Sequence, residues 1–329
     1  MMRTMAVLCV VLAGCFSTVA TTGANKTAED PDKVEPTALE EDQGGAVKPV
    51  PFDGKRAMKY LEAICDIGPR MSATPGMTAQ IKLVTKHFED LGLKVEVQAF
   101  KAKQVTRQNE VEMKNLIIRF FPENQRRIIL CSHYDTRPIA DQEEDKRKWH
   151  DTFISANDGG SGVAFLMELA NHMKGLKTSF GVDFVLFDGE EYIFDSERDK
   201  YFIGSKHFAQ TYKKEKGKAK YAAAVLLDMI GGKDAQFPYE GNSWLKAKDL
   251  CKDIWGVARD LKVNNFKAQE GYTVLDDHTE LLAVGIPSID IIDFDYKHWH
   301  RLSDVPANCS GETLENVSKV LSVWLQRVK

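Results

Sequence analysis

Three carboxylates fall within four residues of the segment FDGEEY, residues 187–192. Asp188, Glu190 and Glu191 follow the apolar run VDFVLF directly. Like charges held this close repel one another, so a proton or a cation must compensate them. Adjacent side chains point in different directions, so one carboxylate can bind a metal ion while its neighbour faces a substrate. A metal site with an acid or base beside it is therefore one interpretation of this segment.

Other polar residues also follow apolar segments, in separate parts of the chain. They are His133, Asp135, Asn157, Asp158, Asp228, Asp276, Asp277, His278, His298 and His300. Taken singly, each reads as a cap, a turn residue or a structural histidine. In open α/β sheets, however, sites form at the carboxyl ends of the strands. Five loops that bring carboxylates and imidazoles to one edge predict a metal site, and these donors suit zinc.

Apolar periodicity predicts the elements that position these residues. Helices are expected at residues 54–67, 76–91, 159–174, 243–261 and 311–328. Strands are expected at residues 93–100, 111–121, 126–134, 182–187, 222–230 and 287–293. Strands that alternate with helices and are apolar at their centres predict a three-layer α/β/α sandwich with a mixed, mostly parallel central sheet.

Composition excludes some classes of protein. The 329 residues include 44 basic and 48 acidic side chains, for a net charge of −4, and no basic patch indicates nucleic-acid binding. Cysteines at positions 65, 131, 251 and 309 are widely spaced and form no C-x-x-C motif. This spacing is typical neither of a zinc finger nor of a disulfide scaffold, and the pairing of these cysteines stays open.

The amino-terminal residues predict export. Residues 1–15 resemble a signal peptide that ends in a bacterial lipobox, LAGC, whose Cys15 would carry a lipid. Such a protein is held at a membrane surface of the cell envelope without a spanning helix. The alternative is a secretory signal cleaved near residues 17–20, which would give a periplasmic or secreted protein. Residues 16–50 read as a disordered acidic linker, and residues 51–329 as the catalytic domain.

The motifs SHYD, NDGGSG, FDGEE, LLDMIG and a final WH, in this order, resemble the zinc aminopeptidase clan. From about residue 55 onward the chain looks most like the glutaminyl-peptide cyclotransferases (glutaminyl cyclases) of that clan. Twelve residues separate Glu191 from Gly204, two aspartates precede His278, and Trp299 precedes the last histidine. Each of these three features is similar to the cyclases rather than to the aminopeptidases.

The resemblance implies a reaction and a role for each candidate residue. Cyclases convert the N-terminal glutamine of peptides and proteins to pyroglutamate and release ammonia, with one zinc ion per chain. The implied zinc ligands are Asp158, Glu191 and His300. The implied catalytic residues are Glu190, as acid and base, and the pair Asp228 and Asp276, which share a proton. Trp299 is implied to line the substrate pocket. We expect a monomer.

Two alternatives stay open. In a two-zinc aminopeptidase, Asp158 would bridge the metals, His133 and Asp228 would hold the second one, and Glu190 would activate water. An inactive, lipid-anchored peptide-binding protein is the other alternative, although no candidate ligand is missing. Cyclases often carry a tryptophan in the loop after the glutamate pair, where this chain has Phe194 and Ser196. The wall of the pocket is therefore not predicted.

Overall fold

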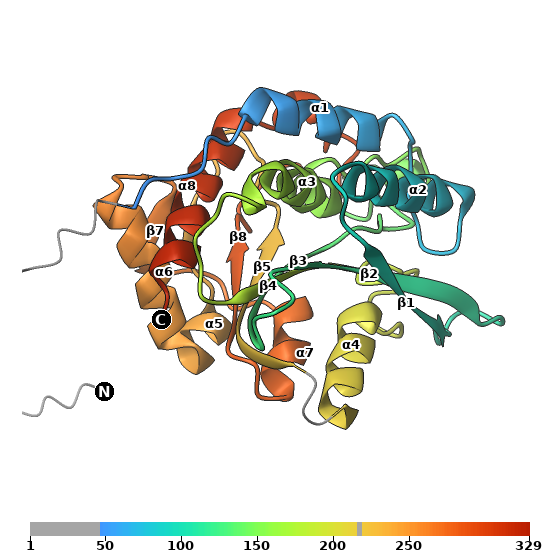
Figure 1. Ribbon diagram of the computed structural model, residues 1–329. Helices are drawn as coiled ribbons and strands as arrows, with labels where there is room; N and C mark the ends of the chain where they lie inside the picture. Colours follow the sequence, from blue (N-terminus) through green and yellow to red (C-terminus); the bar gives the residue numbers. More distant parts are fainter. Residues whose placement is uncertain (1–46, 216–218) are drawn as a thin grey trace, which may run out of the picture. The chain divides into compact units, whose positions relative to one another are not determined.

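A six-stranded mixed sheet forms the centre of the computed structural model, which describes residues 47–215 and 219–329 (Figure 1). The strands are β1 (Val95–Ala102), β2 (Val111–Phe120), β3 (Arg126–His133), β4 (Gly181–Phe187), β5 (Lys220–Asp228) and β8 (Ser288–Ile292), in the spatial order β1-β2-β4-β3-β5-β8. Strands β4, β3, β5 and β8 are parallel, and β2 pairs antiparallel with both β1 and β4. The carboxyl ends of the four parallel strands therefore meet at one edge.

Helices cover both faces of this sheet (Figure 1). One face carries α1 (Gly54–Cys65), α2 (Pro75–Asp90), α3 (Gly162–Met173), α6 (Lys248–Asp260) and α8 (Gly311–Arg327), and the other carries α4 (Ile203–Lys214) and α7 (Asp277–Ala283). A hydrophobic cluster lies on each side of the strands. The predicted three-layer α/β/α sandwich with a mixed, mostly parallel sheet is confirmed.

The strands read as continuous apolar runs because they are covered on both faces. Every residue of β4 is buried, and β3 is buried from Arg127 onward. The one carboxylate inside β4, Asp183, accepts hydrogen bonds from Arg127 and from the Tyr221 hydroxyl. A buried charge needs such partners, so Asp183 does not interrupt the sheet.

Some elements differ from the predictions. The helix expected at 243–261 is broken at Ala247 (φ −136°, ψ 40°) into α5 (Gly241–Lys246) and α6. Helices α4 and α7 and the small parallel sheet of β6 (Phe237–Tyr239) and β7 (Phe266–Glu270) were not predicted. Short helical turns span Lys146–Lys148, Asn157–Ser161 and Pro306–Asn308. These pieces are short or half-exposed, so they carry little periodicity.

Predictions that concern residues 1–46 lie outside the described residues. They are the signal peptide, the lipobox and nearly all of the linker. Among the residues that are described, no helix is long and apolar enough to cross a membrane. The four cysteines of this described region are buried, and each carries a free thiol.

Candidate active site

A pocket of about 460 Å³ opens at the carboxyl ends of the parallel strands. It is lined by seven of the eight predicted site residues: Asp158, Glu190, Glu191, Asp228, Asp276, Trp299 and His300. The eighth, His133, contacts two of them, because its Nε2 lies 3.1 Å from Asp158 Oδ1 and 3.2 Å from Asp228 Oδ1. The structure thus brings these eight residues together.

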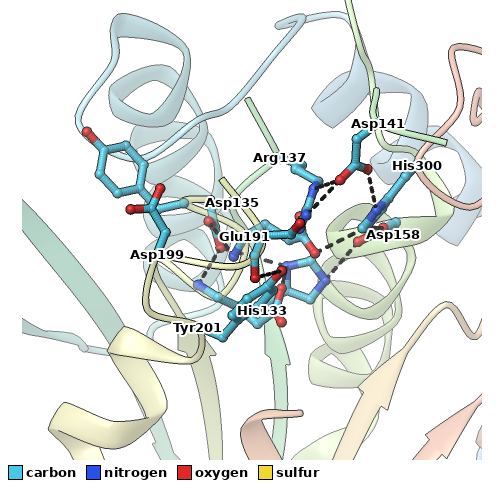
Figure 2. A network of polar contacts seen from close by, with 12 residues as sticks. His133, Asp135, Arg137, Asp141, Asp158, Glu191, Asp199, Tyr201 and His300 are labelled. Carbon is cyan, nitrogen blue, oxygen red and sulfur yellow. Dashed lines mark hydrogen bonds and ion pairs between the residues drawn. The ribbon is translucent and has the colours of Figure 1, made fainter. Parts of the chain in front are cut away.

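Asp158, Glu191 and His300 point toward one another (Figure 2). His300 Nε2 lies 3.1 Å from Glu191 Oε1 and 3.4 Å from Asp158 Oδ2. One donor atom from each of the three residues lies within 4.8 Å of the other two. Two carboxylate oxygens and one imidazole nitrogen that converge in a buried place fit a zinc ion with one open position.

A second group of donors shares Asp158 with the first. His133, Asp158 and Asp228 also offer atoms within 4.8 Å of one another. Since Asp158 belongs to both groups, the arrangement of donors admits one metal ion or two.

Asp135 holds the two adjacent glutamates in place. Its Oδ1 accepts the Glu190 backbone N–H at 3.2 Å, and its Oδ2 accepts the Glu191 N–H at 3.0 Å. The turn before them needs a glycine, because Gly189 has φ +76° and a Cβ there would lie 2.6 Å from Met113 Sδ. Glu191 then points to His300, while Glu190 Oε2 lies 3.8 Å from His133 Nδ1.

The pKa values of the two glutamates are shifted in opposite directions. Burial and the adjacent Glu191 carboxylate raise the pKa of Glu190 well above its ordinary value. Burial acts on Glu191 too, but the Arg137 guanidinium and His300 overcome it and hold the pKa of Glu191 below its ordinary value. Two neighbouring carboxyls with separated pKa values are suited to different roles, one exchanging protons and one staying ionised.

Asp158 depends on a break in the helical backbone. The residue lies ahead of α3 with ψ 113°, and Gly159 follows with φ +68°. A Cβ on Gly159 would lie 2.7 Å from the Asp135 carbonyl oxygen, so this close approach also requires glycine. Asp304 fixes the break by accepting the backbone N–H of Asp158 at 3.2 Å.

Asp276 and Asp228 are both buried at the pocket. Burial and the nearby Asp228 carboxylate raise the pKa of Asp276 well above its ordinary value. Asp276 also caps α7, because its Oδ1 accepts the Asp277 N–H. A proton on one member of the pair relieves the repulsion between them.

Two histidines from the predicted cluster lie elsewhere. His278 is fully buried on α7 with its Nε2 3.0 Å from Glu240 Oε2, and His298 Nδ1 lies 2.7 Å from the Ser303 hydroxyl. Neither lines the pocket. Helix α7 begins immediately after Asp276, so residues 276 and 278 face different sides of it.

Aromatic and polar side chains complete the pocket, and sequence reasoning missed most of them. They are Arg137, Asp141, Gln142, Ser196, Tyr201, Phe202, Met229, Thr273, Val274, Leu275, Ile292 and Phe294. Trp299 stands between His300 and Phe294, with ring centroids 4.2 Å and 5.1 Å away. Ser196 lines the pocket, whereas Phe194 packs under the Arg107 guanidinium. In the sequence, Arg137 and Asp141 could have been noticed only as two oppositely charged residues shortly after His133.

Comparison with known proteins agrees with this geometry. The model of peptidase family M28 matches residues 115–325. The chain belongs to peptidase family M28. This M28 protein is 49% identical to the solved glutaminyl cyclase of Fimbriiglobus ruber, with a TM-score of 0.84 over 86% of this chain and 98% of that one. The predicted resemblance to glutaminyl cyclases is thereby confirmed.

Other relatives of this M28 protein include both branches of the clan. A solved leucine aminopeptidase precursor from Bacteroides thetaiotaomicron is 30% identical, with a TM-score of 0.79 over 86% of this chain and all (100%) of that one. The glutaminyl-peptide cyclotransferase of Bothrops jararaca is 25% identical over an alignment of 244 residues, which covers 64% of this chain and 64% of that protein. This chain therefore spans about two thirds of the length of that snake relative.

Proposed function

We infer that this M28 protein is a zinc-dependent glutaminyl-peptide cyclotransferase, which converts the N-terminal glutamine of peptides to pyroglutamate and releases ammonia. The observation that carries this function is the glutamate pair in a chain 49% identical to a bacterial glutaminyl cyclase. Glu191 converges with Asp158 and His300, while Glu190 faces the pocket with a raised pKa. An ionised ligand beside a proton-exchanging carboxyl is what the cyclisation requires.

The metal would be held by Asp158, Glu191 and His300. A zinc ion bound there supplies the Lewis acidity that makes the amide carbon of the glutamine side chain electrophilic. In this proposal the pocket holds that side chain folded toward the α-amino group of the same residue. Because the reaction is intramolecular, this orientation supplies much of the acceleration.

Glu190 moves the proton. It accepts a proton from the substrate's α-ammonium group, and the freed amine attacks the side-chain amide carbon. As the new carbon–nitrogen bond forms and the bond to the amide nitrogen breaks, Glu190 passes its proton to the leaving nitrogen, and the ring nitrogen releases its second proton to solvent. Ammonia leaves, and the ring remains on the peptide. The raised pKa of Glu190 suits a group that both accepts and gives a proton.

Asp228, Asp276 and Trp299 orient the substrate. Asp276, whose pKa is raised by burial and by the nearby Asp228 carboxylate, holds a proton in this proposal and donates a hydrogen bond. The ring of Trp299, packed beside His300, covers the apolar part of the glutamine side chain. His133 supports the site by contacting Asp158 and Asp228.

A two-zinc aminopeptidase is the second candidate, favoured by the donor group of His133, Asp158 and Asp228 and by the leucine aminopeptidase precursor among the relatives. The test is a count of zinc ions per chain together with two assays, one with a glutamine-initiated peptide and one with leucine amide. We expect one zinc ion, and ammonia with a pyroglutamyl product from the peptide. Two zinc ions and release of leucine would show an aminopeptidase. Zinc-loaded protein that binds the peptide and turns over neither substrate would support a binding protein.

We propose also that the mature protein is exported as a monomer and anchored to a membrane surface through a lipid on Cys15. The export and the anchoring in this proposal rest on residues 1–15. Expression in a bacterium should place the protein in the membrane fraction, and Cys15→Ser should release it. Recovery of both forms in the soluble periplasmic fraction would favour a cleaved secretory signal instead.

A further inference from the structure

Two of the three candidate zinc ligands are joined by an arginine and an aspartate from one short loop (Figure 2). Arg137 Nη1 donates to Glu191 Oε2 at 2.9 Å, and Arg137 Nη2 donates to Asp141 Oδ2 at 2.8 Å. The other oxygen of Asp141, Oδ1, lies 3.0 Å from His300 Nδ1. Since His300 Nε2 lies 3.1 Å from Glu191 Oε1, the four side chains form a closed ring.

We propose, on the basis of the zinc site inferred above, that Arg137 and Asp141 are positioning residues for the metal. Together they make Glu191 a ligand through one oxygen, Oε1, and make His300 a ligand through Nε2. We call the Arg137–Asp141 pair the ligand frame.

Asp141 decides which nitrogen of His300 is free. A carboxylate accepts hydrogen bonds, so the Nδ1 atom beside Asp141 Oδ1 carries the hydrogen. Nε2 is then the nitrogen that offers its lone pair to a metal ion, on the side where Glu191 and Asp158 converge; without the ion it carries a proton toward Glu191 Oε1. An acceptor behind a metal-binding histidine fixes the orientation of the ring and makes the nitrogen a better donor.

Arg137 decides which oxygen of Glu191 is free. Its guanidinium occupies Oε2, so only Oε1 faces His300. The side chain of Arg137 is only 3% exposed, and a buried arginine that loses its partner is costly. Two nitrogens of the Arg137 guanidinium, Nε and Nη2, donate to Asp141, and the third, Nη1, donates to Glu191. The single ammonium nitrogen of a lysine does not reproduce this geometry.

The ring of four side chains joins parts of the chain that are far apart in the sequence. Glu191 and His300 are 109 positions apart in the chain and belong to different loops. The backbone N–H of Gln142 donates to the His300 carbonyl oxygen at 3.2 Å, which places the frame loop beside the histidine. His300 itself has φ +52°, a strained conformation that the surrounding contacts must maintain.

The same segment offers a matched control. Arg147 and Asp145 form an ion pair at 2.7 Å, but the Arg147 side chain is 90% exposed. Among the described contacts, this pair reaches no candidate ligand. Its loss removes an arginine–aspartate interaction from the neighbourhood without touching the site.

Zinc affinity of the complete protein, measured by competition with a chromophoric chelator and without substrate, tests the frame. Arg137→Met and Asp141→Ala should weaken zinc binding by about 10–100-fold. Arg137→Lys and Asp141→Asn keep a charge or an acceptor and should fall in between, whereas Arg147→Met should bind zinc as the unmodified protein does. The proposal would be overturned if Arg137→Lys and Asp141→Asn both kept a zinc affinity within about twofold of the unmodified protein and if Arg137→Met or Asp141→Ala kept it as well.

Two further readouts separate positioning from a merely structural role. The Tm of zinc-free Arg137→Lys and Asp141→Asn, which keep a charge or an acceptor, should stay close to that of the zinc-free unmodified protein while their zinc affinity falls. Cobalt-loaded Arg137→Met should absorb less visible light than the cobalt-loaded unmodified protein, because Glu191 can then use both oxygens and raise the coordination number. A parallel loss of zinc-free stability in every frame variant, with an unchanged cobalt spectrum, would contradict the frame.

The proposed function fails in a different way. Unmodified protein that binds zinc, responds to the frame variants and yet does not cyclise glutamine peptides would refute the cyclase and leave the frame standing. Protein that cyclises glutamine peptides, but whose zinc affinity is unchanged by the frame substitutions, would support the cyclase and refute the frame.

Discussion

Glu190 and Glu191 are chemically identical, and only their surroundings distinguish them for the different roles proposed above. Asp135 holds both backbone N–H groups, so the two side chains leave one turn in different directions. Arg137 and His300 then surround Glu191, whereas burial dominates at Glu190 and its pKa rises. The proposed separation of ligand and acid/base thus depends on neighbours that the motif FDGEE does not contain.

Asp135→Ala should disturb both glutamates at once. Two buried N–H groups would lose their acceptor, and each loss costs about 1–3 kcal/mol of stability. Urea unfolding should show this loss, and zinc affinity should fall because Glu191 is no longer held. Unchanged stability and zinc binding would mean that the turn is maintained by other contacts.

Asp277→Asn should remove a pH-dependent loss of stability. Burial raises the pKa of Asp277 to about 7, so between pH 4 and 7 the folded protein keeps a proton that the unfolded chain has released. Stability contributed by this group is therefore present at low pH and is lost as pH rises through 7. In urea titrations, the free energy of unfolding of zinc-free Asp277→Asn should exceed that of the zinc-free unmodified protein by about 1–4 kcal/mol at pH 8 and by much less at pH 4. An equal difference at both pH values would contradict this.

The sequence predicted the donors at the site, and not what orients them. His133, Asp158 and Glu191 follow strands, and that placement is readable from apolar runs. Arg137 and Asp141 are also a charged pair after a strand, but the exposed pair of Asp145 and Arg147 looks the same in sequence. Only the fold shows which pair is buried against a ligand.

At the scale of elements, the long buried strands and helices were predictable because their apolar pattern repeats over many residues. All six strands of the main sheet and the helices α1, α2, α3 and α8 were expected close to where they lie. The broken helix α5–α6 and the unpredicted α4 depend on single backbone conformations, at Ala247 and at Phe202 with φ +56°. Such conformations are set by tertiary contacts and leave no periodic signal.

The loop between Glu191 and α4 carries Ser196, Tyr201 and Phe202 to the pocket, and Asp199 anchors it. The carboxylate of Asp199 accepts the N–H of Thr106 at 3.0 Å from outside the loop and the N–H of Phe194 at 3.0 Å from within it.

Asp199→Ala should loosen this wall of the pocket and raise KM by about 3–10-fold with a smaller change in kcat. Asp195→Ala is the control, since Asp195 Oδ1 accepts only the local N–H of Glu197 among the described hydrogen bonds. Equal kinetics for both variants would show that the loop needs no anchor.

At the scale of the whole molecule, the site ties together parts of the chain that are far apart. Asp158, Glu191 and His300 come from different connections of one sheet, so a metal ion that binds them links β4, α3 and the segment before α8. The layers and the sheet edge were predictable from alternating strands and helices. The pairing of Gln142 with His300, which closes the site, was not.

Removal of zinc should therefore lower the stability of the entire domain. A ligand that binds only the folded state adds about 2.7 kcal/mol when present at 100 times its Kd. For a domain of this size, calorimetry should show a rise of roughly 4–5 °C in Tm when zinc is added back. His300→Ala should show no such rise. A zinc-dependent rise that survives His300→Ala would place the metal elsewhere.

The most direct test compares Glu190→Gln with Glu191→Gln, by measuring bound zinc and ammonia release from a glutamine-initiated peptide in the same samples. We expect Glu190→Gln to keep its zinc and to lose about 100–10,000-fold in kcat, because the acid and base is gone. Glu191→Gln should lose zinc affinity together with activity. If Glu190→Gln loses its zinc, or keeps both zinc and activity, the division of roles between the two glutamates is wrong.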